Sequence, residues 1–248
     1  MASDARSLED PRTHLRALGG ALVVVVLVVL LASVAVSLGY PLIDAAGIAR
    51  DGALGLALRS AFQFVGFGVA GVGYLVVTDQ TDLVTVRFPT RADAKWLAGG
   101  FVALLGLYLA VSGVLTALGI EGAESTIVMQ GSDQPVYFLY LIPVTILLVG
   151  PMEELIFRGI VQGLFRRAYG PAVAVAAASA VFAAVHLTSY SGEGLLATLA
   201  TVLVLGGVLG IVYEKCRNLV VPAVVHGLFN TVQFLAVYAT TTGVVSGW

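Results

Sequence analysis

Cysteine, histidine and charge are all scarce in this sequence of 248 residues. It holds one cysteine and three histidines, and only 11% of its residues are charged, against roughly 25% in an average soluble domain. One cysteine cannot form an internal disulfide, and a cysteine metal cluster needs several. The net charge of −2 and the lack of a basic patch give no nucleic-acid partner. The composition therefore excludes a soluble domain, a disulfide scaffold and a nucleic-acid-binding protein.

Apolar residues are what the sequence has in excess. They make up 58% of the chain, with a mean hydropathy of +0.97. A hydrocarbon core ~30 Å thick needs about 20 apolar residues per helix. Such runs predict an all-α, polytopic membrane helix bundle with about seven transmembrane helices, at residues 18–39, 54–77, 96–120, 136–157, 171–187, 194–213 and 219–241. We divide the chain into an N-terminal tail (1–17), three scaffold helices (18–135), four helices that hold the intramembrane polar groups (136–241) and a C-terminal tail (242–248).

Basic residues between the predicted helices fix the expected orientation. Positive charge accumulates in the cytoplasmic loops of membrane proteins. With the N-terminus inside, the cytoplasmic segments hold ten basic residues and the opposite loops hold Arg50 alone. The ten are Arg6, Arg12, Arg16, Arg87, Arg91, Lys95, Arg166, Arg167, Lys215 and Arg217. We therefore predict a multi-pass protein of the plasma membrane with the N-terminus inside and the C-terminus outside (N-in/C-out).

Glu153 and Glu154 are the two acidic residues that fall within a predicted span. A charge at the centre of a membrane helix costs about 2.5–3.5 kcal/mol, so a pair there indicates function. Residues four apart share a helix face, which stacks Glu154 on Arg158, whereas Glu153 points about 100° away. We expect Glu154 and Arg158 to form a structural ion pair and Glu153 to be the working group.

Two histidines also lie in apolar spans, each with a partner four residues away: Phe182 with His186, and His226 with Asn230. The Gly170-Pro171 pair predicts a turn that returns the chain as an antiparallel helix, which brings His186 level with Glu153. If His186 is that shallow, residues 187–194 must cross much of the bilayer without helical structure. Such a segment is tolerated only where protein buries it or where it lines a wet cavity.

Glycines gather in two of the predicted spans. Gly66, Gly68, Gly71 and Gly73 lie in the second, and Gly206, Gly207 and Gly210 lie in the sixth. Small residues allow membrane helices to approach closely. We expect both sets to serve packing.

In order and spacing, the motifs Glu153-Glu154-x-x-x-Arg158, Phe182-x-x-x-His186 and His226-x-x-x-Asn230 resemble those of the CPBP intramembrane proteases. That family includes the type II CAAX prenyl endopeptidases and the bacteriocin-processing and immunity proteins, and the resemblance covers about residues 140–235. It makes 136–241 the catalytic part of the chain. It also implies hydrolysis of peptide bonds in membrane-anchored or transmembrane peptide substrates, at a site in the lipid bilayer that faces the cytoplasm.

The resemblance also implies roles for the motif residues. Glu153 with His186 would activate a water molecule, and His226 with Asn230 would stabilise the oxyanion. The family is often labelled metalloprotease, and Glu153, His186 and His226 would supply three ligands to one zinc ion. The sequence contains no His-Glu-x-x-His helix, and spacing alone does not decide between zinc and a glutamate acting without metal.

Two other functions stay open at this point. A protein that keeps this fold without catalysis would be a membrane immunity or scaffold protein. Glutamate and histidine also build proton relays, as in a proton-coupled transporter. Transporters usually consist of repeated halves, and here the polar groups lie in the last four helices only.

Overall fold

A computed structural model describes residues 11–245. Seven of its helices are long and apolar enough to cross a membrane, which confirms the predicted all-α polytopic bundle. Parts of the two predicted tails, residues 1–10 and 246–248, lie outside the described residues. The spans are Pro11–Ala45 (α2), Ala53–Val77 (α3), Arg91–Ala117 (α4), Val136–Tyr169 (α6 to α8), Pro171–Thr188 (α9 and η4), Leu195–Cys216 (α10) and Val220–Thr241 (α11).

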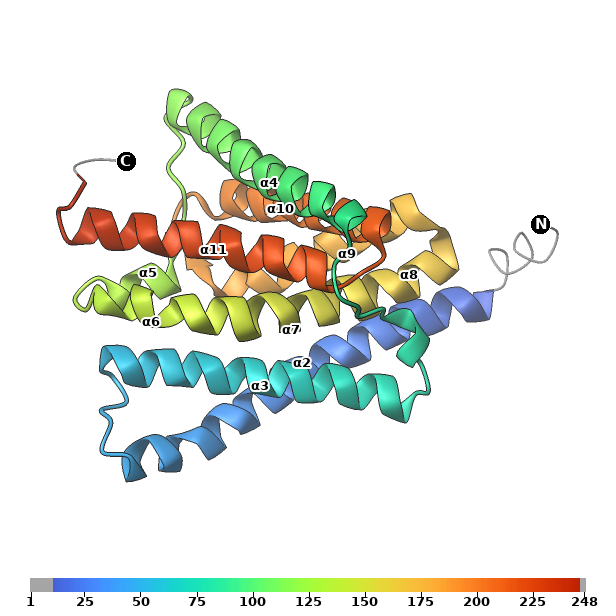
Figure 1. Cartoon of the computed structure of the whole chain (residues 1–248), viewed down its shortest axis with the longest axis horizontal. Coiled ribbons are helices and arrows are strands. Elements are labelled where there is room, and N and C mark those ends of the chain that lie inside the picture. The colour runs from blue at the N-terminus through green and yellow to red at the C-terminus, as the bar shows by residue number, and fades with distance from the viewer. Residues whose placement is uncertain (1–10, 246–248) are drawn as a thin grey trace.

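The fourth span lies at the centre of the bundle (Figure 1). Helices α2 and α3 pack against each other on one side of it, and α11, α10 and α4 lie on the other. Helix α9 packs between α8 and α10. Helix α2 begins at one end of the bundle and α11 ends at the opposite end, as an odd number of spans requires (Figure 1).

The fourth span is longer than predicted and is not a regular α-helix. It continues to Tyr169 rather than ending at residue 157, because its last three turns pack against α9, α10 and α2 instead of entering water. Two π-helical segments, Thr145–Val149 (η2) and Leu155–Val161 (η3), interrupt it. They separate α6 (Val136–Val144), α7 (Gly150–Glu154) and α8 (Gln162–Tyr169). Such segments are rare and occur often at functional sites.

Short elements fill the connections. The loop after α3 contains η1 (Thr81–Leu83), and the loop after α4 contains β1 (Glu124–Ser125) and α5 (Thr126–Gly131). After α9 (Pro171–Val185) come η4 (His186–Thr188) and β2 (Tyr190–Ser191), and β2 pairs antiparallel with β1. The segment 187–194, expected to be non-helical, thus contains the end of a 3₁₀ turn and the strand β2, which pairs with β1. These satisfy part of its backbone, as chain at membrane depth requires.

The glycine prediction is correct in part. A Cβ at Gly66 would lie 2.5 Å from the Leu31 carbonyl oxygen, so α2 and α3 touch backbone to backbone there. A Cβ at Gly71 would clash with side chains of η3, again a packing role. At Gly73 and Gly207 a Cβ would meet nothing within 4 Å, so the packing prediction is wrong for these two positions.

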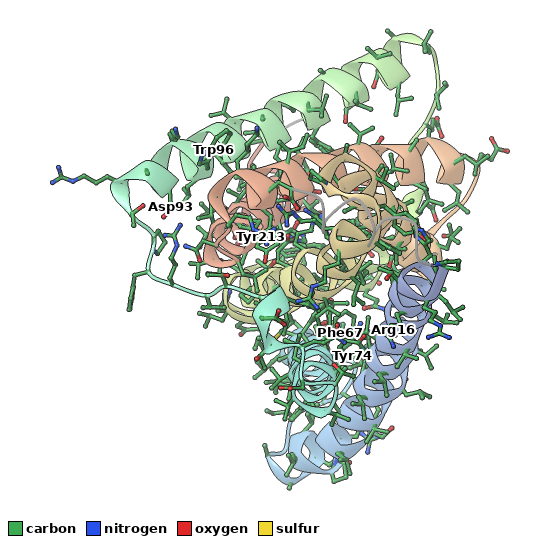
Figure 2. All side chains as sticks on the ribbon, turned by 90° about the vertical axis from the view of Figure 1, so that its right-hand side faces the viewer. Arg16, Phe67, Tyr74, Asp93, Trp96 and Tyr213 are labelled. Atoms are coloured by element: carbon green, nitrogen blue, oxygen red, sulfur yellow. The ribbon has the colours of Figure 1, made fainter. Side chains whose placement is uncertain are left out.

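One end of the bundle carries much of the basic charge. Arg167 pairs with Asp82 at 2.6 Å and Arg166 with Glu214 at 2.9 Å, both near the end of α8. Figure 2 looks onto the end where α2 begins, with Arg16 on α2, Asp93 on α4 and Tyr213 of α10 near the middle. The N-in/C-out orientation remains a prediction that this end faces the cytoplasm.

Single cysteines at Asp82 and Ser132, in a variant without Cys216, test that orientation in sealed membranes. Asp82 lies in the loop that joins α3 to α4. Ser132 follows α5 and lies just before the start of the fourth span at Val136. We expect a membrane-impermeant thiol reagent to label Asp82→Cys from the cytoplasmic side and Ser132→Cys from the opposite side. If Ser132→Cys is labelled only from the cytoplasmic side, the predicted topology is wrong.

Candidate active site

Glu153 and Glu154 lie at the end of α7, the short α-helical turn between the two π segments. Their surroundings differ: the Glu154 side chain is fully buried, whereas that of Glu153 keeps 11% of its surface exposed. Adjacent helical residues point in different directions, which is how one carboxylate is fully enclosed while the other keeps a small exposed part. The two groups are therefore not equivalent.

Glu154 forms the expected ion pair with Arg158. The Arg158 Nε lies 3.3 Å from Glu154 Oε2, and both side chains are buried. The guanidinium also donates to the Gly206 carbonyl of α10 at 3.2 Å and lies 4.6 Å from the centre of the Phe182 ring. Removing one partner of a buried pair leaves the other charge uncompensated. Arg158 thus holds α9, α10 and Glu154 together.

His226 lies between the two carboxylates, a contact that the sequence did not predict. Its Nδ1 is 3.0 Å from Glu154 Oε1, and its Nε2 is 3.7 Å from Glu153 Oε2. A carboxylate only accepts hydrogen bonds, so His226 Nδ1 carries the hydrogen and is the donor of the hydrogen bond to Glu154. The second nitrogen is left facing Glu153 and the opening.

Two glycines explain why α11 reaches the carboxylates. A Cβ at Gly150 would lie 2.6 Å from the Ala223 carbonyl oxygen, and one at Gly227 would lie 3.2 Å from the Ile146 Cα. The backbones of α11 and of the η2–α7 region therefore touch, which any larger residue at these positions would prevent. Gly227 directly follows His226, so this crossing sets the depth of the imidazole.

His186 caps α9 on the same side of the bundle. Its Nδ1 lies 2.7 Å from the Phe182 carbonyl oxygen, so this nitrogen is the donor and Nε2 is left with its lone pair. The imidazole packs on the Phe182 ring, whose centre is 4.5 Å away, and Phe182 in turn makes an edge contact with His226 at 6.1 Å. In the described part of the chain, His226 and not His186 makes the direct contact with Glu153.

Asn230 lies one turn beyond His226 on α11, as predicted. Its amide Nδ2 donates to the Thr145 hydroxyl at 3.2 Å, at the start of η2. This contact orients the amide, and Thr145 itself is fully buried. The structure thus brings Glu153, Glu154, Arg158 and His226 into contact, and places His186 and Asn230 on either side of them.

Three polar residues around the site were missed by sequence reasoning: Thr145, Tyr190 and Gln162. Tyr190 of β2 stacks on His186 with ring centres 6.4 Å apart. Burial, and after it the negative charge of Glu153, raises the pKa of the Tyr190 phenol, which keeps it a donor. The usable signal, for Gln162 alone, was spacing, because it follows Arg158 by four residues.

The zinc alternative needs three ligands that converge. Within residues 11–245 no three histidine, cysteine, aspartate or glutamate side chains lie close enough together to hold a metal ion. His226 Nδ1 is engaged with Glu154, and His186 makes no contact with Glu153 in this conformation. The residues present therefore do not fit a zinc site here, and the chemistry below is derived without one.

Seven apolar helices with two buried carboxylates and the buried His226 between them define a polytopic membrane protein with a polar site inside its bundle. Residues 135–232 match the family model of the Rce1-like type II CAAX prenyl endopeptidases. This part of the chain, which holds all six motif residues, is similar to that family of membrane proteases, which confirms the resemblance seen in the sequence. No curated protein and no solved structure matches the chain significantly.

Proposed function

We propose that this chain is an intramembrane endopeptidase that cleaves CAAX-type or other membrane-anchored peptides from the cytoplasmic side of the plasma membrane. The match of residues 135–232 to a protease family model supports the class of reaction. The observation that carries the assignment of residues is the unequal carboxylate pair. Arg158 and His226 both pair with Glu154, whereas Glu153 keeps 11% of its side chain exposed and forms no ion pair with an arginine among the described residues.

In the proposed reaction Glu153 is the general base, with His186 Nε2 as a second acceptor that orients the water. Glu153 takes a proton from the water as its oxygen attacks the scissile carbonyl carbon. The carbon–nitrogen bond then breaks, and the proton passes from Glu153 to the leaving amine. A carboxylic acid and an amine result, so one water is consumed for each bond cleaved.

The oxyanion formed in the attack needs donors aimed at it. We assign these to His226 and Asn230 of α11. His226 donates to the oxyanion from Nε2 only when both ring nitrogens carry hydrogen, since Nδ1 already donates to Glu154 and Nε2 faces Glu153. In that form the Nε2–H is a donor at the open side of the site, and Thr145 holds the Asn230 amide in place.

The direct test is cleavage by purified protein in proteoliposomes of peptides that end in a CAAX sequence, with and without a prenyl group. Mass spectrometry of the products locates the bond that is cut. Glu153→Gln protein is the control for contaminating proteases. A wild type that leaves both peptide sets and a mixture of transmembrane peptides intact would favour the non-catalytic immunity or scaffold function.

Asn230→Ala is expected to lower kcat by roughly 10²–10³-fold with little change in KM, the effect of removing one oxyanion donor. The donor strengthens only as charge develops on the oxygen, so substrate binding stays the same. Thr145→Val is the matched variant: it removes the partner but keeps the amide, and should cost less. A raised KM with unchanged kcat would instead make Asn230 a substrate-binding residue.

Metal analysis of the same preparations distinguishes between His226 as an oxyanion donor and His226 as a zinc ligand. Under the proposal, wild type and His226→Ala contain no stoichiometric zinc and a chelator leaves wild-type turnover unchanged. Zinc bound one to one in the wild type and lost from His226→Ala would overturn the oxyanion assignment.

A further inference from the structure

A column of polar side chains leads from Glu154 to the end of the bundle. On the fourth span these are Glu154, Arg158, Gln162 and Arg166, each four residues after the last. Four residues of α-helix turn about 400°, so such a series drifts by about 40° at each step. The wider π turns of η3, which begin just after Glu154, offset the drift and keep the series facing α10.

Helix α10 supplies the other side of this polar column with a matching series, Gly206, Gly210 and Glu214. The Gly206 carbonyl accepts from Arg158, as described above, and the Gly210 carbonyl accepts from Gln162 Nε2 at 3.2 Å. Gln162 Nε2 also donates to Glu214 Oε1 at 2.9 Å, and Arg166 Nε to Glu214 Oε2 at 2.9 Å. The two glycines present no side chain to the column, so it contains backbone oxygens as well as charged groups.

Burial falls off along the column. Glu154, Arg158 and Gln162 are fully buried, the Glu214 side chain is 12% exposed and that of Arg166 is 43% exposed. At 1.5 Å per residue, the twelve residues from Glu154 to Arg166 span about 18 Å, more than half of a ~30 Å hydrocarbon core. The column therefore joins the site to the end of the bundle that is predicted to face the cytoplasm.

Several atoms of the column have no hydrogen-bond partner among the described residues. They are Glu154 Oε2, Arg158 Nε, Arg158 Nη1 and Gln162 Oε1. Arg158 Nε and Glu154 Oε2 attract each other as an ion pair at 3.3 Å, but they are not aligned as donor and acceptor. Buried polar atoms bond to protein or to water almost without exception. Donors and acceptors that alternate along one line are what a chain of water molecules requires.

We propose that this polar column is a hydrated path that delivers water from the membrane surface to Glu154, behind the substrate. The use of that water rests on the proposed function, because hydrolysis consumes one water for each bond. A bound peptide must lie over the open side of the site, at Glu153 and His186, and would cover it. The column reaches the carboxylate pair from the buried side and stays open to water while the peptide is bound.

Ser179 offers a conservative place to measure hydration of the column. A Cβ at Gly206 would lie 3.5 Å from Ser179 Cβ and 3.6 Å from Arg158 Nη2, so this buried serine lies beside the column. The neighbouring Ala178 is equally buried but belongs to the apolar core. Ser179→Cys and Ala178→Cys, each in a Cys216→Ala protein, thus compare a wet with a dry position at the same depth.

The probe is Ag⁺, a thiol-binding ion small enough to follow a water path. Protein in detergent is exposed to Ag⁺ for a set time, unfolded, and alkylated, and mass spectrometry reports the thiols still free. We expect Ag⁺ to protect the Ser179→Cys thiol from alkylation at least about tenfold faster than the Ala178→Cys thiol. The reason is that a wet thiol ionises more readily, and one pKa unit is a factor of ten in the amount of thiolate. Equal rates would show that the column is dry and only joins α8 to α10. Gln162→Cys against Val161→Cys repeats the comparison should the Ser179 variant not fold.

A blocking variant tests the route. Gln162→Leu removes the polar group halfway along the column. Protection of the Ser179→Cys thiol by Ag⁺ should then be about tenfold slower or more, which corresponds to a rise of one unit in the thiol pKa. An unchanged rate would mean that water arrives through the open side of the site, which overturns the path. Neither measurement needs cleavage. If the column fails these tests, the proposed protease function is not affected. If the protein is inactive but its column is wet, only the proposed protease function is contradicted.

Discussion

Glu153→Gln is expected to abolish peptide-bond hydrolysis while the protein remains folded. Glutamine keeps the size and the hydrogen-bonding oxygen of the side chain but cannot take a proton from water, and a general base contributes about 10²–10⁴-fold. The Glu153 side chain keeps 11% of its surface exposed, and His226, its ion-pair partner among the described residues, also bonds to Glu154. Losing its charge therefore strands no buried cation. Turnover of a peptide that the wild type cleaves is the measurement, with the elution profile and melting temperature in detergent as evidence of folding.

His186→Gln is the companion variant for that experiment. Since the role proposed for His186 is to orient the water, and not to take the proton, its loss should lower kcat less than the loss of Glu153 itself. The assignment has a clear contrary outcome. If Glu153→Gln keeps near-wild-type turnover while Glu154→Gln is inactive and well folded, the roles of the two carboxylates are exchanged.

Features that depend on one segment of chain were predictable from the sequence. The seven spans follow from runs of apolar residues, and residues 11–245 contain seven such helices. The ion pair between Glu154 and Arg158 follows from their spacing of four, which puts both on one helix face. The same rule, extended by four residues once more, would have found Gln162, but not Tyr190, which lies in β2 beyond the end of α9.

Features that depend on how two segments meet were not predictable. The contact of His226 with both carboxylates requires the crossing at Gly150 and Gly227, where two backbones touch. A glycine in the sequence does not say which helix will lie against it. Gly73 illustrates this, since it belongs to the same series as Gly66 and Gly71 but faces nothing within 4 Å. The two π segments and the β1–β2 pair likewise arise from tertiary contacts and leave no local pattern.

Glu154→Gln is expected to destabilise the folded protein by about 3–5 kcal/mol, the usual effect of breaking a buried ion pair from one side. Arg158 would be left fully buried with the Gly206 carbonyl and the Phe182 ring as its remaining partners. His226 Nδ1 would also lose the charge on its acceptor, so the cost is not confined to one pair. Unfolding in mixed micelles with increasing denaturing detergent measures the change against the wild type.

The matched controls for this prediction are Glu153→Gln and a double variant. Glu153→Gln removes a charge one residue away without stranding an arginine, and should unfold close to the wild type. Adding Arg158→Met to Glu154→Gln removes the uncompensated cation, and should recover much of the lost stability, since apolar residues often replace buried ion pairs at little cost. If the double variant is as unstable as Glu154→Gln alone, the loss comes from the contact of Glu154 with His226, and Glu154 acts by positioning the imidazole rather than by neutralising Arg158.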